Sequence, residues 1–176
     1  MSNTTVDPVA TPAAYQRMLL SLLGDDDPVA VHAGTEARLR ALVAEASREL
    51  RTRPAPSEWS VLELLGHFVD AELVTSARVR WILAEDEPEI VPYDQDRWVD
   101  GLRHNDDDPD DLLALFSALR AANLRLWTTR RQDERGRLGL HRERGPESYE
   151  LTVRLLAGHD RFHIAQTERT IAALRR

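Results

Sequence analysis

The sequence predicts an all-α protein that folds as a four-helix bundle with two long connections. Apolar residues recur every three or four positions in four long stretches, which is the spacing of the buried face of a helix. Residue types that begin and end helices bound these stretches, and no segment shows a convincing strand pattern. Long helices of this kind bury their apolar faces by packing side by side as a bundle.

The predicted elements follow one another along one domain that covers residues 1–176. Residues 1–11 are small and polar and are expected to form a flexible arm. A short extra N-terminal helix is expected to follow this arm and to precede the bundle. The short helix is predicted over Pro12–Leu23, the long helices over Val29–Leu50, Ser60–Glu85, Asp108–Trp127 and Tyr149–Leu174, and the connections over Pro88–Asp108 and Arg130–Gly145.

Two helix starts carry clear signals. Ser60 is followed three residues later by Glu63, the capping-box pattern in which each side chain accepts a hydrogen bond from the backbone of the other residue. Asp108 stands directly before Pro109, which is an N-cap residue before a first-turn proline. The connection Pro88–Asp108 shows little periodicity, and a connection of this length is typical of a lid, a binding loop or a disordered linker.

The composition excludes several classes of protein. Asp and Glu total 30 and the basic residues total 23, so the net charge is −7 and non-specific binding to nucleic acid is disfavoured. The chain contains no cysteine, which excludes disulfides, cysteine nucleophiles and thiolate metal ligands. It also contains no lysine, which excludes a Schiff-base lysine and a P-loop lysine.

Nothing in the sequence predicts a membrane span or a signal peptide. No apolar run approaches the length of about 18 residues that a spanning helix needs. The first ten residues contain neither a basic cluster nor an apolar core. We therefore expect a cytoplasmic protein that binds neither a membrane nor nucleic acid.

Two histidines have the spacing of a metal-binding pair. His159 and His163 are four residues apart on the last predicted helix, so their imidazoles project from one face. His67 borders the apolar stripe of the helix that begins at Ser60, and a bundle can bring it opposite the pair. Three histidines with an open fourth position suit one divalent metal ion, and imidazole ligands do not separate Zn from Ni. The alternative, histidines packed in the core with no ion, stays open at this point.

The other polar candidates are weaker. Asp70, Asp160 and Glu63 lie near these histidines in sequence and could orient the imidazoles by hydrogen bonds. The arginines of residues 130–144 are interpreted as a solvated loop, with contact to an anionic substrate as the alternative. The remaining histidines have no partner at ligand spacing and are expected to be structural or exposed: His32, His104 and His141. No Ser–His–Asp or Cys–His arrangement is apparent.

Three segments resemble the DinB-like superfamily. Residues 58–72, EWSVLELLGHFVDAE, resemble its second helix, and residues 158–166, GHDRFHIAQ, resemble its last helix. Residues 92–98, PYDQDRW, resemble the linker of the YfiT-like branch, which includes bacillithiol S-transferases and proteins described as metal-dependent hydrolases. The similarity covers about Pro56–Ala173 and is weaker in the first 53 residues.

The resemblance implies a four-helix bundle with Zn or Ni held by three histidines, which correspond to His67, His159 and His163. It also implies a homodimer in many members and a low-molecular-weight thiol as co-substrate in some. Within the matching motifs we expect Tyr93, Trp98 and Gln166 to bind the small-molecule substrate.

The expected function is transfer of a low-molecular-weight thiol to a small electrophile at a three-histidine metal site. A metal-dependent hydrolase that uses metal-bound hydroxide and a non-catalytic metal-binding bundle remain the alternatives. Different measurements distinguish these three functions. A transferase consumes a thiol, a hydrolase turns over esters or amides without one, and a structural site loses stability on chelation without any turnover.

Overall fold

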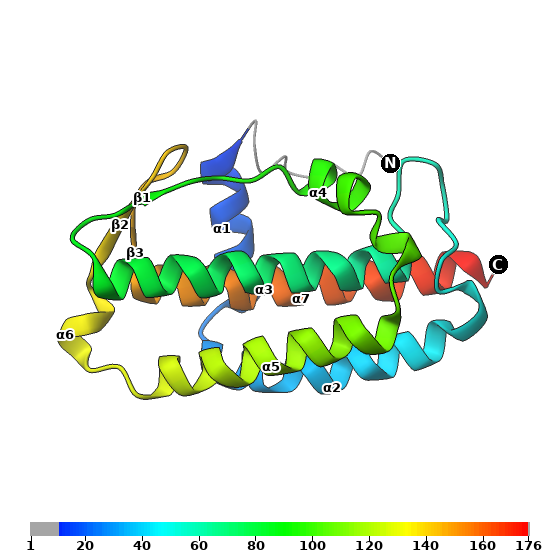
Figure 1. The fold of residues 1–176 in the computed structure, drawn as a ribbon, viewed down its shortest axis with the longest axis horizontal. Coiled ribbons are helices and arrows are strands. Elements are labelled where there is room, and N and C mark those ends of the chain that lie inside the picture. Colours follow the sequence, from blue (N-terminus) through cyan, green and yellow to red (C-terminus); the bar gives the residue numbers. More distant parts are fainter. Residues whose placement is uncertain (1–10, 176) are drawn as a thin grey trace.

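The computed structural model describes residues 11–175 and confirms the all-α four-helix bundle (Figure 1). A small sheet lies at one end of the bundle, and a short N-terminal helix crosses the bundle helices. The predicted arm, residues 1–11, lies outside the described residues except for Thr11. The elements are α1 (Pro12–Leu23), α2 (Pro28–Ala46), η1 (Ser47–Glu49), α3 (Val61–Ala84), β1 (Glu89–Ile90), α4 (Gln95–Leu102), η2 (His104–Asp106), α5 (Pro109–Thr128), α6 (Gln132–Arg135), β2 (Leu138–His141), β3 (Gly145–Ser148) and α7 (Tyr149–Leu174).

The bundle consists of α2, α3, α5 and α7. Helix α3 packs against α5 and α7, and α2 packs against the same two helices, so the four form a closed ring around the core. The connection after α3 carries the chain back along the bundle, and α3 and α5 therefore run in the same direction (Figure 1). None of the helices within residues 11–175 is long and apolar enough to cross a membrane.

The predicted helix starts are present. Ser60 caps α3 through its side chain, and the Glu63 carboxylate accepts a hydrogen bond from the Ser60 backbone N–H at 2.8 Å, which completes the capping box. Asp108 caps α5 by accepting from the Asp110 backbone N–H at 2.8 Å. Helix α2 ends at Ala46, before its predicted end, because Ser47 adopts a left-handed φ of 36° that interrupts the α-helical conformation.

The expectation of no strand is wrong, because the two polar connections form a three-stranded sheet. β1 pairs in parallel with β2, and β2 pairs antiparallel with β3, whose first residue, Gly145, follows the connecting turn with a φ of 77°. Strands of two to four residues are too short to show a reliable alternation of polar and apolar positions. The connection Pro88–Asp108 is also more ordered than predicted, since it contains α4 and η2 as well as β1.

Helix α1 reaches the bundle at a glycine. A Cβ atom on Gly158 of α7 would lie 2.1 Å from the backbone oxygen of Leu19, a distance that no side chain tolerates. Gly158 therefore lets α1 lie directly on α7. This contact brings the side chains of α1 over the part of α7 that carries His159.

A buried ionic network crosses the middle of the bundle. The guanidinium of Arg120 on α5 donates to Glu72 on α3 at 2.8 Å and to Asp160 on α7 at 2.8 Å. It also donates to the backbone oxygen of His32 on α2 at 3.0 Å. Arg120 is 2% exposed, and neither carboxylate is more exposed. One side chain thus links all four bundle helices.

Replacing this arginine tests how much the bundle depends on it. Arg120→Met leaves two carboxylates buried without their cation, and removing one partner of a buried ion pair typically costs about 3–5 kcal/mol. We expect a loss of this size in the free energy of unfolding, measured by urea denaturation. Arg38→Met is the matched control, because Arg38 and its partner Glu168 are both exposed. The control should lose less than about 1 kcal/mol. Equal losses of unfolding free energy in the two variants would contradict the dependence of the bundle on the buried ion pairs of Arg120.

Candidate metal centre

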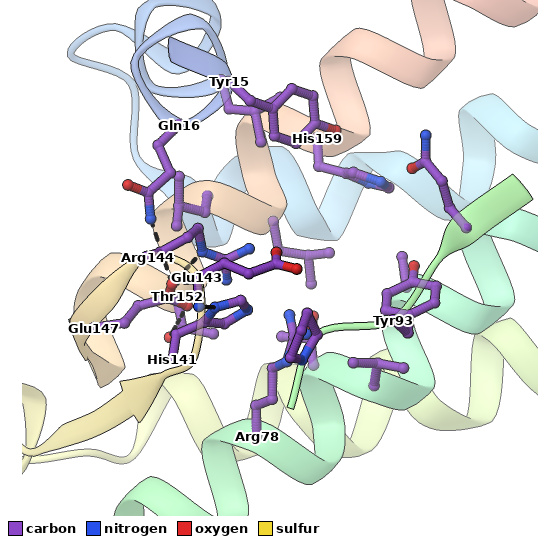
Figure 2. A pocket seen from close by; sticks show the side chains of 18 residues that line it. Tyr15, Gln16, Arg78, Tyr93, His141, Glu143, Arg144, Glu147, Thr152 and His159 are labelled. Atoms are coloured by element: carbon purple, nitrogen blue, oxygen red, sulfur yellow. Dashed lines mark hydrogen bonds and ion pairs between the residues drawn. The ribbon is translucent and has the colours of Figure 1, made fainter. Parts of the chain in front are cut away.

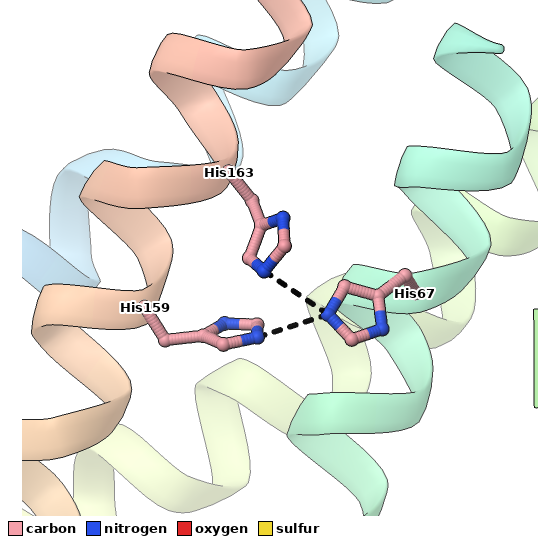
Figure 3. A group of neighbouring side chains, drawn as sticks. All are labelled: His67, His159 and His163. Atoms are coloured by element: carbon pink, nitrogen blue, oxygen red, sulfur yellow. Dashed lines mark hydrogen bonds between the residues drawn. The ribbon is translucent and has the colours of Figure 1, made fainter. Parts of the chain in front are cut away.

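The structure brings together the three histidines that the sequence singles out (Figure 3). His67 projects from α3, and His159 and His163 project from α7. The Nε2 atom of His67 lies 2.9 Å from Nε2 of His159 and 3.3 Å from Nε2 of His163. His67 and His163 are buried, whereas His159 is partly exposed. One potential ligand atom of each residue therefore faces a common point between the two helices.

Aromatic rings surround the buried side of this cluster. The Trp59 ring lies 5.0 Å from that of His67, and the Phe162 ring lies 4.8 Å from that of His163. Phe68 approaches His159 and His163 edge-on. These rings exclude water from one side of the cluster and keep its surroundings apolar.

Burial keeps the three imidazoles neutral. It lowers the pKa of His67 and His163 well below the ordinary value, with the neighbouring histidines adding to the effect. The pKa of His159 falls to about 4, again chiefly through burial, since Asp160 raises it and Arg120 lowers it by smaller amounts. A neutral imidazole has a lone pair on one nitrogen, which is the form that binds a metal ion.

One hydrogen bond determines which nitrogen of His163 carries that lone pair. Nδ1 of His163 lies 2.9 Å from the amide oxygen of Gln166. An amide oxygen only accepts, so Nδ1 carries the hydrogen and Nε2 is left bare, facing the other two histidines. The cluster fits a divalent ion, because one ring nitrogen of each histidine lies near a common point, where a cation can take the place of a shared proton. A Zn–N bond of about 2.0–2.1 Å in a tetrahedral site separates neighbouring nitrogens by about 3.3 Å, close to the larger of the two distances observed.

The acidic residues expected to orient the imidazoles do not do so. Each of the three carboxylates is bound elsewhere, and none forms a hydrogen bond to His67, His159 or His163. Their partners are His104 for Asp70, Arg120 and His32 for Asp160, and Arg53 for Glu63. Within residues 11–175, the Nδ1 atoms of His67 and His159 are buried without a hydrogen-bond partner. The side chain that orients an imidazole is Gln166, which the sequence suggested as a substrate ligand.

His104, which the sequence left as structural or exposed, is buried. It is 5% exposed and lies between Asp70 and Asp107, with 2.8 Å between ring nitrogen and carboxylate on each side. The turn η2 folds the ring against Gly66, where a Cβ would lie 2.3 Å from the ring. His104 therefore fills space that a glycine leaves open, which its loop position in the sequence does not reveal.

His32 and His141 are also buried. His32 is fully buried, with Nδ1 3.1 Å from Asp160 and Nε2 3.0 Å from the backbone oxygen of Val153, so it is structural. His141 lies on β2, is 2% exposed and borders a cavity. Its position depends on the sheet that the sequence did not predict.

The cavity has a volume of about 110 Å³ and adjoins the cluster through His159 (Figure 2). Its walls come from α1, α3, α7, the β2–β3 hairpin and the segment before α4. Tyr93, one of the residues expected to bind substrate, lines this cavity. Trp98 and Gln166 are not among the lining residues. Trp98 instead packs on Tyr93, with 4.7 Å between ring centroids, and so supports the cavity wall.

The structure is a helical bundle in which three histidines from two helices converge beside a cavity, an arrangement that fits a metal ion. The family model of the DinB superfamily matches residues 32–167. The chain belongs to this superfamily, as the three sequence segments indicated.

Two relatives are informative. A protein of Geobacillus thermodenitrificans (strain NG80-2) named "Putative metal-dependent hydrolase" is 30% identical over 98 residues, which are 54% of this chain and 55% of the relative. The match thus spans about half of that protein. The solved structure of YfiT from Bacillus subtilis, described as "a probable metal-dependent hydrolase with an unusual four-helix bundle topology", is 20% identical. It matches with a TM-score of 0.74 over 99% of this chain and 93% of that one, which shows a shared fold.

The lowered pKa values predict a pH dependence of stability. An imidazole with a depressed pKa in the folded state binds its proton more weakly there than in the unfolded chain, so stability is fully present above about pH 6.5 and falls as the pH drops. For His159, with a pKa of about 4, the loss between pH 7 and pH 5 is on the order of 2 kcal/mol.

Urea unfolding of the metal-free protein at the two pH values measures this loss. Asp70 and Asp107 raise the pKa of His104, which opposes the effect. The informative comparison is therefore between wild type and His159→Gln, and the variant should show the weaker pH dependence. An identical pH dependence of stability in both proteins would show that His159 does not have a lowered pKa in the folded protein.

The hydrogen bond from His163 to Gln166 predicts an effect on metal affinity. Gln166→Leu removes the acceptor that orients the ring, and loss of such a partner typically weakens metal binding by about 10–100-fold. Gln166→Glu keeps an acceptor and should not weaken binding. Competition with a chromogenic zinc chelator measures both affinities. Unchanged affinity in Gln166→Leu would show that the hydrogen bond does not position His163.

Proposed function

We propose that the protein is a metal-dependent enzyme that holds one divalent ion, Zn or Ni, through His67, His159 and His163. The observation that carries this proposal is the convergence of three neutral imidazoles at the edge of a cavity. The names of the two relatives, which both refer to metal-dependent hydrolases, support the dependence on metal.

The residues of this chain have distinct tasks in that site. Gln166 orients His163, while Trp59 and Phe162 close the buried side to water. The cavity beside His159 admits a small molecule from the opposite side. A divalent ion bound by three imidazoles lowers the pKa of a water or a thiol in its remaining coordination position.

The reaction we propose is transfer of a low-molecular-weight thiol to a small electrophile. Within the described part of the chain, the cluster contains no carboxylate to serve as a base. A thiol, with an ordinary pKa of about 8.5, loses its proton near neutral pH far more readily than water, with a pKa of about 15.7. The lack of a base is therefore a smaller obstacle to a reaction that uses a thiol than to hydrolysis, which uses water. Hydrolysis is the second candidate, supported by the names of the relatives.

The proposal includes a cytoplasmic location and a homodimer. Leu73 and Trp81 on α3 are 47% and 44% exposed, although both are large and apolar. Apolar side chains that remain exposed on one helix support association with a second copy of the chain.

Metal content is the first test of the site. Elemental analysis of purified wild-type protein should find about one divalent ion per chain, since three imidazoles suffice for a stable site with an open position. His163→Ala leaves two imidazoles and should lose the ion. His141→Ala, which removes a histidine outside the cluster, should retain it. Retention of stoichiometric metal by His163→Ala would show that the ligand set is wrong.

The same samples test the reaction. Metal-loaded protein should accelerate the reaction of a thiol such as cysteine with monochlorobimane, and both chelation and His163→Ala should abolish the acceleration. Turnover of p-nitrophenyl acetate without thiol, in the absence of thiol transfer, would replace the proposed reaction with hydrolysis. Full metal content without either activity would contradict an enzymatic function.

A further inference from the structure

An arginine that has no anionic partner within residues 11–175 lines the cavity beside His159. Arg78 of α3 lines the cavity and is 9% exposed. Its Nη2 atom donates to the backbone oxygen of Val91 at 3.1 Å, and its Nε atom is buried without a hydrogen-bond partner in residues 11–175. Although burial lowers its pKa, a guanidinium remains protonated in proteins. Arg78 therefore brings a full positive charge to the wall of the cavity.

His141 supplies a second unused donor to the same cavity (Figure 2). Its Nδ1 accepts from the backbone N–H of Glu143 at 3.2 Å. The pKa of His141 is lowered to about 4, mainly by burial and further by Arg144 and Arg78, so the ring is neutral near pH 7. The hydrogen of the neutral ring must then lie on Nε2, which is buried without a partner.

The acidic residues near Arg78 do not neutralise it. Glu147 is 2% exposed and is bound by Arg144 at 2.7 Å and by Thr152 at 3.0 Å, so its charge balances that of Arg144. Glu143 also lines the cavity but is exposed to solvent. Among the described residues that line the cavity, the buried charges therefore sum to one positive charge, that of Arg78. A buried charge without a partner is unfavourable, and a ligand of opposite charge removes this penalty.

We propose that Arg78 and His141 form a subsite for one carboxylate group, and that the substrate is a small molecule that carries a carboxylate. Two N–H donors from separate residues suit the two oxygens of a carboxylate, and its single negative charge equals the unbalanced charge of the site. A phosphate dianion would leave a surplus negative charge in the buried site. The carboxylate lies at Arg78 and His141, and the reacting end of the molecule points toward His159. Binding of the carboxylate does not depend on the proposed function. Only the reaction at the other end of the molecule, near His159, rests on it.

Matched pairs of probes test the subsite. Butyrate and butyramide differ in charge but little in size, and NMR titration of metal-free protein gives both affinities. The wild type should prefer the acid by about 10-fold or more, since a hydrogen bond to a charged group contributes about 1.5–3 kcal/mol. Arg78→Gln should lose this preference while its affinity for butyramide stays the same. Arg142→Gln is the control, because it removes the same charge from an exposed position on the neighbouring hairpin.

A second variant and a second probe pair keep the test decisive if Arg78→Gln does not fold. His141→Phe removes the Nε2–H donor, together with the Nδ1 atom that accepts from the Glu143 backbone N–H, and should weaken butyrate binding by about 5-fold, the effect of about 1 kcal/mol. For zinc-loaded protein, 3-mercaptopropionate should bind more tightly than 3-mercaptopropionamide, measured by calorimetry.

The outcomes separate this inference from the proposed function. Equal affinity of the wild type for acid and amide, or an unchanged preference in Arg78→Gln, overturns the carboxylate subsite even where metal binding and turnover are intact. Tighter binding of inorganic phosphate than of butyrate overturns it in favour of a phosphate site. An Arg78-dependent preference for butyrate in a protein that never takes up metal supports the subsite and contradicts the metal-dependent function.

Discussion

The guanidinium of Arg120 is the contact on which the arrangement of the bundle depends. From its position on α5, it donates hydrogen bonds to buried carboxylates on α3 and α7 and to a backbone oxygen on α2. Two buried carboxylates are tolerable only in the alignment of helices that brings both to this one cation. Asp160 follows His159 directly in the chain, and Glu72 lies little more than one turn from His67. The ionic network therefore also sets how the two halves of the histidine cluster face each other.

Burial then gives the cluster its chemistry. The same packing that removes the histidines from water makes protonation unfavourable and leaves lone pairs for a cation. The site is asymmetric, since aromatic rings close one side and the cavity opens the other at His159. On the cavity side, Arg78 and His141 offer unused donors.

The predictability of each part follows from the range of the interactions that produce it. Helical periodicity and capping signals are local, so the bundle and the start of α3 at Ser60 could be predicted. The His159–His163 pair is also local, whereas pairing it with His67 required the bundle as an intermediate step. The sequence could not decide whether His104 and His141 are structural or exposed, because their burial depends on η2 and the sheet, which form through contacts between distant segments. Arg78 could not be identified from the sequence, because the missing partner of an arginine on a helix is apparent only when the positions of all its neighbours are known.

The histidine cluster and the cavity differ in how far the residues matched by the superfamily model include them. The cluster lies on α3 and α7, helices of the bundle that the superfamily match covers. The cavity, in contrast, takes part of its wall from α1, which precedes the matched residues and supplies Tyr15 and Gln16. Helix α1 can reach α7 only because residue 158 is a glycine. Helix α1 therefore closes one side of the cavity beside His159, and a cavity bounded in this way can select a ligand by size and charge.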